Sequence, residues 1–145
     1  MSYEDLTPAD YIRELGLQPH AEGGWYNRTW REDDGTERGS ASAIYYLLEE
    51  GQKSHWHRNT FAEMWLWHAG HPLIIETCES RDGPVTAQRV DPLHPQGFVA
   101  KDLWQTARPV SGWTLVTCVV SPGFDVSGWE LAPEDWAPTG WSPAR

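Results

Sequence analysis

The sequence has 145 residues, a length that suits one domain with a core of its own. Its formal net charge is −10, and its lysines and arginines form no cluster, so neither nucleic acid nor an anionic membrane is expected as a partner. No run approaches the ~20 consecutive apolar residues of a membrane-spanning helix. Residues 1–6 lack the basic-then-apolar pattern of a secretory signal, and we expect a cytoplasmic protein.

The first predicted element is a short helix within residues 1–16. Thr7 is a good N-cap residue, Pro8 fits the first helical turn, and Gly16 is a typical stop. The segment is too short to form a core of its own. We therefore expect it to serve as an N-terminal cover.

The rest of the chain predicts many short strands. Thirteen glycines and eleven prolines favour turns over long helices. Five runs of strand length are rich in apolar, β-branched or aromatic residues: 25–31, 41–48, 63–68, 73–78 and 113–120. The runs at 41–48 and 113–120 are apolar on both alternating faces, as in strands packed between two layers. This pattern predicts an all-β sandwich or closed barrel over residues 17–131.

We find no internal repeat and no interdomain linker, so residues 1–145 are expected to form a single domain. Residues 132–145 are rich in proline and tryptophan and are expected to wrap the barrel as irregular chain. The two cysteines, Cys78 and Cys118, lie in apolar strand-like runs. Buried free thiols are their expected state.

The chemistry of the chain is concentrated between residues 51 and 70. His55 and His57 are two residues apart, so on a regular strand both imidazoles point to one face. Glu63 follows after a turn and shares a face of the next strand with Trp65. If that face is the interior, two imidazoles and a carboxylate converge there. Such a ligand set suits one divalent metal ion, Zn, Mn, Fe or Ni.

The spacing Gly51-x3-His55-x-His57-x5-Glu63-x6-Gly70 resembles the first motif of the cupin superfamily. More narrowly, the chain resembles the small Cupin_5-type family of unknown function. The blocks that carry this resemblance are 17–26, 43–48, 54–58, 69–73, 104–105, 120–124 and 129–131. The resemblance implies a double-stranded β-helix (a cupin or jelly-roll barrel), related to the RmlC-like proteins. It also implies a homodimer and a ligand pocket at one mouth of the barrel.

The sequence departs from the family pattern at the second cupin motif. That motif usually reads Pro-x-Gly-x-x-His, whereas residues 100–105 end in Gln105. An amide oxygen is a weaker ligand than an imidazole, which lowers the expected metal affinity. A metal held by His55, His57, Glu63 and Gln105 is therefore one hypothesis. A metal-free pair, with Glu63 orienting the imidazole of His57, is the other, and both stay open.

Five further residues are candidates for holding a substrate. Glu22 precedes two glycines, which let backbone approach a ligand, although a plain surface turn is the alternative. Trp25, Trp65 and Trp104 either line the cavity or fill the core. Gln105 occupies the usual ligand position and is expected to hydrogen-bond the substrate. The remaining histidines are expected at the surface or in turns: His20, His68, His71 and His94.

These residues favour two functions over a third, a purely structural or interaction protein, because a solid β-core does not need costly imidazoles and carboxylates that point inward. The first is an isomerase, epimerase or lyase acting on a sugar or nucleotide-sugar derivative, with His57 as general base or metal ligand and Glu63 as its partner. The second is a non-catalytic module that senses or stores a small ligand in the same cavity. No nucleotide cofactor is expected, because Gly23-Gly24 does not resemble a phosphate-binding loop.

Overall fold

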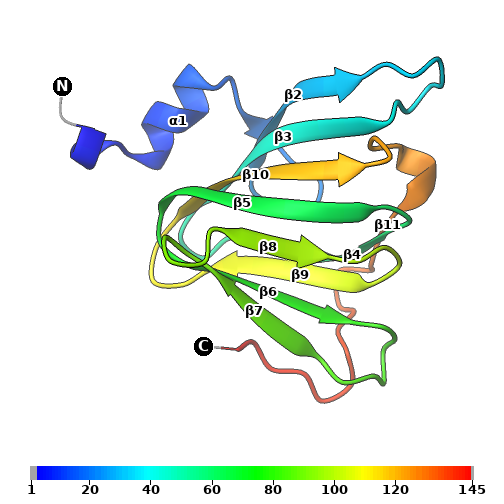
Figure 1. Ribbon diagram of the computed structural model, residues 1–145. Helices are drawn as coiled ribbons and strands as arrows, with labels where there is room; N and C mark the ends of the chain where they lie inside the picture. The colour runs from blue at the N-terminus through cyan, green and yellow to red at the C-terminus, as the bar shows by residue number, and fades with distance from the viewer. Residues whose placement is uncertain (1–2, 145) are drawn as a thin grey trace.

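The computed structural model describes residues 3–144 and shows two β-sheets with a short helix beside them (Figure 1). A 3-10 turn, Tyr3–Asp5, precedes helix α1, Pro8–Glu14, and a second 3-10 turn, η2, spans Val126–Gly128. The strands are β1 (Gln18–Pro19), β2 (Trp25–Glu32), β3 (Ala41–Leu48), β4 (Ser54–Asn59), β5 (Ala62–Gly70), β6 (Leu73–Cys78), β7 (Thr86–Val90), β8 (Gln96–Val99), β9 (Trp104–Pro109), β10 (Thr114–Ser121) and β11 (Trp129–Leu131).

The strands form a six-stranded sheet in the order β1-β2-β3-β10-β5-β8 and a five-stranded sheet in the order β11-β4-β9-β6-β7. All pairings within the two sheets are antiparallel. A core lies between the sheets, with Tyr46 and Trp65 from one and Leu73 and Ile75 from the other. The structure thus confirms the expected mostly-β sandwich with one short N-terminal helix.

Helix α1 begins where the sequence predicts. The Thr7 side chain accepts a hydrogen bond from the backbone N–H of Asp10, and the Asp10 carboxylate accepts one from the N–H of Thr7. This reciprocal capping box satisfies two backbone donors that the helix leaves unpaired. After the helix, Gly16 adopts a φ of +62°, which glycine tolerates better than other residues.

Helix α1 covers the outer face of β3 and β10. Leu47 and Leu115 are buried on that face and pack with Leu17, while Ile12 and Leu15 contact the same cluster. The neighbouring positions in each strand face the core between the sheets. Both strands therefore lie between two apolar layers, which explains why their sequences are apolar on both faces.

The C-terminal segment covers the outer face of the five-stranded sheet. It contains no helix or strand between residues 132 and 144, as the sequence predicts. The ring of Trp56, from β4, lies 5.8 Å from that of Trp136 and 5.4 Å from that of Trp141. The Trp141 indole N–H also donates to the buried Glu76 carboxylate at 2.9 Å. The segment is therefore fastened to the sheet by aromatic packing and by hydrogen bonds.

Strands β1, β7, β8, β9 and β11 lie where the sequence pattern predicts none. β7 and β8 are edge strands of their sheets, and most of their residues are at least partly exposed. An edge strand needs no continuous apolar face, so its sequence carries little alternation signal. Cys78 and Cys118 are buried free thiols, as expected.

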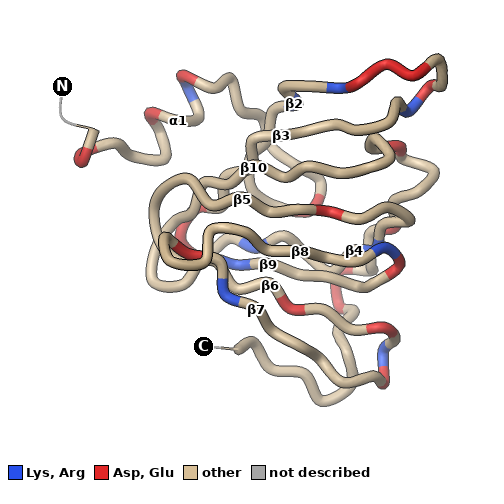
Figure 2. Tube along the Cα trace, viewed as in Figure 1, with Lys and Arg blue, Asp and Glu red and all other residues tan. Residues whose placement is uncertain are grey.

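Charged residues are unevenly distributed along the chain. Figure 2 shows acidic residues gathered in the loop between β2 and β3, and it shows no comparable run of basic residues among those described. In residues 3–144, no helix is long and apolar enough to cross a membrane.

The packing of α1 predicts a clear contrast between two leucines. Leu47 is fully buried under the helix, whereas Leu93 is 86% exposed. Leu47→Ala should lower the free energy of unfolding by about 2–5 kcal/mol, because it leaves a cavity in a packed cluster. Leu93→Ala makes the same chemical change at the surface and should have almost no effect. Urea denaturation measures both. Equal effects would contradict the packing described for α1.

Candidate functional site

The site begins with an irregularity in β4. Its pairing with β9 shifts register between Ser54 and His57. Ser54 and His57, three residues apart, both reach the carboxylate of Glu22, at 3.1 and 3.3 Å. The His55 imidazole instead contacts the tail, with Nε2 2.9 Å from the carbonyl oxygen of Pro133. The structure therefore does not bring His55 to the carboxylate that His57 contacts, and an irregular pairing of this kind breaks the strict alternation of a strand.

His57 is held from both sides of its ring. Nδ1 lies 2.8 Å from the carbonyl oxygen of His55, and a carbonyl oxygen only accepts hydrogen bonds. The hydrogen of the neutral ring therefore sits on Nδ1. Nε2 faces Oε2 of Glu22 at 3.3 Å, so a proton on Nε2 would be held between the two groups.

Glu22 lies on a loop that its own sequence shapes. Its carboxylate accepts hydrogen bonds from the Ser54 hydroxyl at 3.1 Å and from the Trp129 indole N–H at 2.8 Å. The following residue, Gly23, has a φ of +113°, and a side chain there would meet the Lys53 carbonyl oxygen at 2.1 Å. Only glycine fits this close approach, and the loop is thereby held with Glu22 facing inward.

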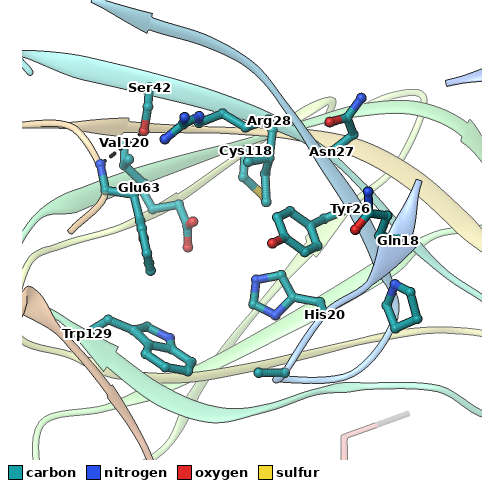
Figure 3. Close-up of a pocket in the computed structure, with 14 residues that line it drawn as sticks. Gln18, His20, Tyr26, Asn27, Arg28, Ser42, Glu63, Cys118, Val120 and Trp129 are labelled. Carbon is teal, nitrogen blue, oxygen red and sulfur yellow. Dashed lines mark hydrogen bonds between the residues drawn. The ribbon is translucent and has the colours of Figure 1, made fainter. Parts of the chain in front are cut away.

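A cavity of about 670 Å³ opens beside these groups, and we call it the main cavity (Figure 3). Its lining comes from β1, the loop that follows it, β2, β3, β5, β10, the segment before η2, and β11: Gln18, Pro19, His20, Ala21, Tyr26, Asn27, Arg28, Ser42, Ile44, Glu63, Cys118, Val120, Phe124 and Trp129. A smaller hollow of about 40 Å³, the deep recess, shares several of these residues and adds Glu22, Tyr46, Asn59 and Trp65. The volume of the main cavity is in the range of small-molecule sites.

Glu63 lines both hollows, yet its side chain is almost entirely buried. Burial raises the pKa of this carboxyl group from 4.5 to about 7. The charge of His57 opposes this rise in pKa and the charge of Glu22 adds to it. Hydrogen bonds from Gln105 and from the Trp65 indole N–H, at 3.1 Å for the latter, stabilise the ionised form. Glu63 is thus a carboxyl group that exchanges its proton near neutral pH.

His57 and Gln105 do not line either hollow. They are paired opposite each other on β4 and β9, and both are buried, with exposed fractions of 2% for His57 and 1% for Gln105. We expected both to meet the substrate; in the structure His57 contacts Glu22 and Gln105 hydrogen-bonds Glu63, and Glu22 and Glu63 line the deep recess. The Oε1 atom of Gln105 and the Oδ1 atom of Asn59 are buried without a hydrogen-bond partner among the described residues. Of these two, Asn59 belongs to the deep recess.

The three candidate tryptophans divide between cavity and exterior. Trp65 lines the deep recess, which agrees with the first of the two alternatives, cavity lining. Trp25 packs on the outer side with the α1 cluster, and its N–H donates to Glu49 at 2.8 Å. Trp104 packs outside with Trp136, at 4.6 Å between rings. Trp25 and Trp104 therefore fill apolar clusters on the outer faces of the two sheets and do not line the cavity, in agreement with the alternative.

Sequence reasoning missed His20, Tyr26, Arg28 and Trp129, which all line the main cavity. The His20 ring lies 4.6 Å from Tyr26, and its Nδ1 accepts the backbone N–H of Glu22 at 3.0 Å. Burial lowers the pKa of His20, although the nearby Glu22 carboxylate opposes this. His20 is therefore not a surface histidine. For Tyr26 and Arg28 a signal existed, since alternation along β2 places them opposite Trp25.

A family model of the cupin superfamily matches most of the chain. Cupin_5 (DUF985) matches residues 9–132, which contain both sheets and all residues of the site. The chain belongs to the Cupin_5 family. No curated protein matches it.

Solved structures agree with the Cupin_5 assignment. Protein SO0799 from Shewanella oneidensis is 36% identical, with a TM-score of 0.80 over 88% of this chain and 85% of that one. A hypothetical protein from Leishmania major is 28% identical, with a TM-score of 0.75 over 88% of each chain. Oxalate decarboxylase from Bacillus subtilis is 11% identical, with a TM-score of 0.62 over 90% of this chain and 31% of that one. The last shows the fold alone, and together they confirm the cupin sandwich.

The residues of this Cupin_5 chain do not fit the metal centre that the first motif suggests. His55 contacts the tail and not the cavity. His57 keeps only Nε2 free of backbone contacts, and that atom faces Glu22. Within residues 3–144, no group of three or more His, Cys, Asp or Glu side chains is arranged to hold a metal ion. We therefore derive no chemistry through a metal.

The raised pKa of Glu63 predicts a stability that depends on pH. In the unfolded chain this group has its ordinary pKa of 4.5, whereas in the folded protein the pKa is about 7. Between these values the folded state holds the extra proton, so stability is lost as the pH rises through about 7. The melting temperature of the wild type should fall between about pH 5 and pH 8 more steeply than that of Glu63→Gln. Glu130→Gln, at an exposed carboxylate, should keep the wild-type slope. Parallel slopes for wild type and Glu63→Gln would contradict the burial argument.

The arrangement of the candidate metal ligands predicts that chelators do not change the stability of the protein. Dialysis against EDTA should leave the melting temperature unchanged, because we expect no bound metal to stabilise the folded protein. Elemental analysis of protein purified without added metal should find Zn, Mn, Fe and Ni only in substoichiometric amounts. A loss of melting temperature in EDTA that one of these ions restores in the wild type, but not in His57→Ala, would overturn this interpretation.

Proposed function

We propose that this Cupin_5 protein binds a small molecule in the main cavity and transfers a proton on it, as an isomerase or epimerase. One observation carries the proposal: Glu63 lines an open cavity and has a pKa near 7. A group with a pKa close to the working pH is well suited to take up and return a proton within one reaction cycle. The cavity volume also suits a sugar or a nucleotide-sugar derivative, the substrate class that the family resemblance suggests.

The proposed chemistry needs a base and a group that polarises a carbonyl. Ionised Glu63 removes the proton from a carbon next to the substrate carbonyl, which breaks a C–H bond and forms a carboxyl O–H bond. The electron pair moves onto the carbonyl oxygen. In an epimerase, Glu63 then returns the proton to the same carbon after the substrate presents its other face. In an isomerase, Glu63 returns the proton to the former carbonyl carbon, the proton of the adjacent hydroxyl passes to the oxyanion, and the new carbonyl forms at the hydroxyl-bearing carbon. No electrons are gained or lost overall.

His20 suits the role of the polarising group. Its Nδ1 accepts the Glu22 N–H, so the hydrogen of the neutral ring lies on Nε2. Burial lowers its pKa, which favours this neutral form. Figure 3 shows His20 and Glu63 at different places on the cavity wall, with open space between them. An Nε2–H donor there would stabilise negative charge on the substrate oxygen.

Glu22 and His57 set the proton affinity of Glu63 in this proposal, and of the two only Glu22 lines a hollow. The Glu22 carboxylate raises the pKa of Glu63, and His57 lowers it. His57 in turn contacts Glu22. His57 is therefore a positioning residue, whereas Glu22 both lines the deep recess and affects how readily Glu63 releases its proton.

A second candidate function is binding without catalysis. The buried Oδ1 atom of Asn59 lines the deep recess and has no partner among the described residues. A buried acceptor without a partner is costly, and a hydroxyl or amide donor of a ligand would satisfy it. This observation favours a ligand equally well in an enzyme and in a protein that senses or stores a metabolite.

Exchange of carbon-bound hydrogen in D2O distinguishes the two functions. A metabolite panel is first tested by thermal shift, and each stabilising compound is then followed by NMR for loss of signal next to its carbonyl. We expect exchange with the wild type, and a rate about 10²–10⁴-fold lower with Glu63→Gln, which removes the base. Glu130→Gln is the matched control, because Glu130 is exposed and paired with Arg58. Stabilisation without any exchange would support the binding function and contradict the isomerase.

A further inference from the structure

Arg28 is an unpaired cation on the wall of the main cavity. It lies on β2 and reaches over the cavity on the side of Ser42 and Cys118 (Figure 3). Within residues 3–144 its side chain has no hydrogen bond, ion pair or ring contact. Other arginines are engaged: Arg58 pairs with Glu130, and Arg108 pairs with Glu76. The guanidinium group of Arg28 therefore remains available to a ligand.

The charge of Arg28 is unusual for its surroundings. The chain has a formal net charge of −10, and the other charged groups that line the cavity and its recess are carboxyl groups or histidine. In a protein with more acidic than basic residues, an exposed arginine usually has a carboxylate within reach, but Arg28 contacts none of those described. Its planar group presents parallel N–H donors that match the two oxygens of a carboxylate or phosphate.

The other residues that line the cavity indicate which further groups the ligand carries. Tyr26 and Trp129 offer aromatic surfaces to the middle of the cavity, with the Tyr26 hydroxyl pointing into it (Figure 3). Glu63 lines both the main cavity and the deep recess, and the unpaired Asn59 acceptor lies in that recess. A ligand that occupies both hollows is therefore lined by Arg28, Glu63 and Asn59. It needs an anionic group at one end and hydrogen-bond donors at the other.

We propose that the ligand of the main cavity is an anionic, hydroxyl-bearing metabolite whose carboxylate or phosphate group binds Arg28 and whose hydroxyl groups reach Asn59. This inference rests on the proposed function in one respect, namely that the main cavity is the ligand site. It narrows the substrate to a class, sugar acids and sugar phosphates, that share the anionic group.

The test compares three probes that differ in charge: glucuronate, glucose 6-phosphate and uncharged glucose. Binding to the wild type, Arg28→Gln and Arg89→Gln is measured by calorimetry and protein-observed NMR at low and high salt. Arg89→Gln is the matched control, since it removes the same charge from β7, away from the cavity. Melting temperatures of the three proteins establish that each is folded.

We expect at least one anionic probe to bind the wild type and Arg89→Gln, and to bind Arg28→Gln about tenfold to hundredfold more weakly. Its affinity for the wild type should fall with salt, because Arg28 is exposed. Binding of glucuronate alone assigns a carboxylate, binding of glucose 6-phosphate alone assigns a phosphate, and binding of both supports the shared chemistry. The proposal is overturned if Arg28→Gln binds the anionic probes as tightly as the wild type. It is equally overturned if glucose binds as tightly as they do, or if none of the three binds.

The outcomes for Arg28 and for Glu63 are separable. If an anionic probe needs Arg28 but its exchange in D2O does not need Glu63, the inference stands and the isomerase fails. If exchange of a substrate needs Glu63 but is unchanged in Arg28→Gln, the proposed function stands and this inference fails.

Discussion

The site depends on one departure from regular strand geometry, the register shift in β4. In a regular strand Ser54 and His57 would face opposite sides of the sheet. The shift in pairing with β9 brings both onto the Glu22 carboxylate, and it directs His55 to the Pro133 carbonyl in the tail. Without it, Glu22 would lose one or both of these contacts. The histidine pair that looks most like a metal site in the sequence is thereby separated.

The consequence of this separation is an electrostatic arrangement based on buried carboxyl groups. Glu22 and Glu63 lie near enough for the charge of one to raise the pKa of the other, and both are shielded from water. Two buried carboxylates are expensive to ionise together. At Glu22 this cost is reduced by hydrogen bonds from Ser54 and Trp129. At Glu63 the cost raises the pKa of the carboxyl group to about 7. One carboxyl group is thus held in place and the other is left free to exchange a proton.

The sequence predicts the fold well because its signals are local or familial. The capping residues Thr7 and Pro8 mark helix α1, and the apolar runs of β3 and β6 coincide with the strands. The site is less predictable for a physical reason. Alternation predicts the direction of a side chain only where strand pairing is regular. Because β4 pairs irregularly with β9, the directions of His55 and His57 could not be predicted from their spacing. His20 approaches the cavity through the loop that precedes β2, and no periodic pattern places a loop residue.

The covering of β4 from outside has a consequence for how change at a distance reaches the cavity. Trp56 lies between His55 and His57, and its ring is enclosed by Trp136 and Trp141 of the tail. These indoles thereby support, from the outer side of the sheet, the strand whose Ser54 and His57 contact Glu22. A substitution at Trp136 or Trp141 therefore alters the packing of β4 without changing any residue that lines the cavity.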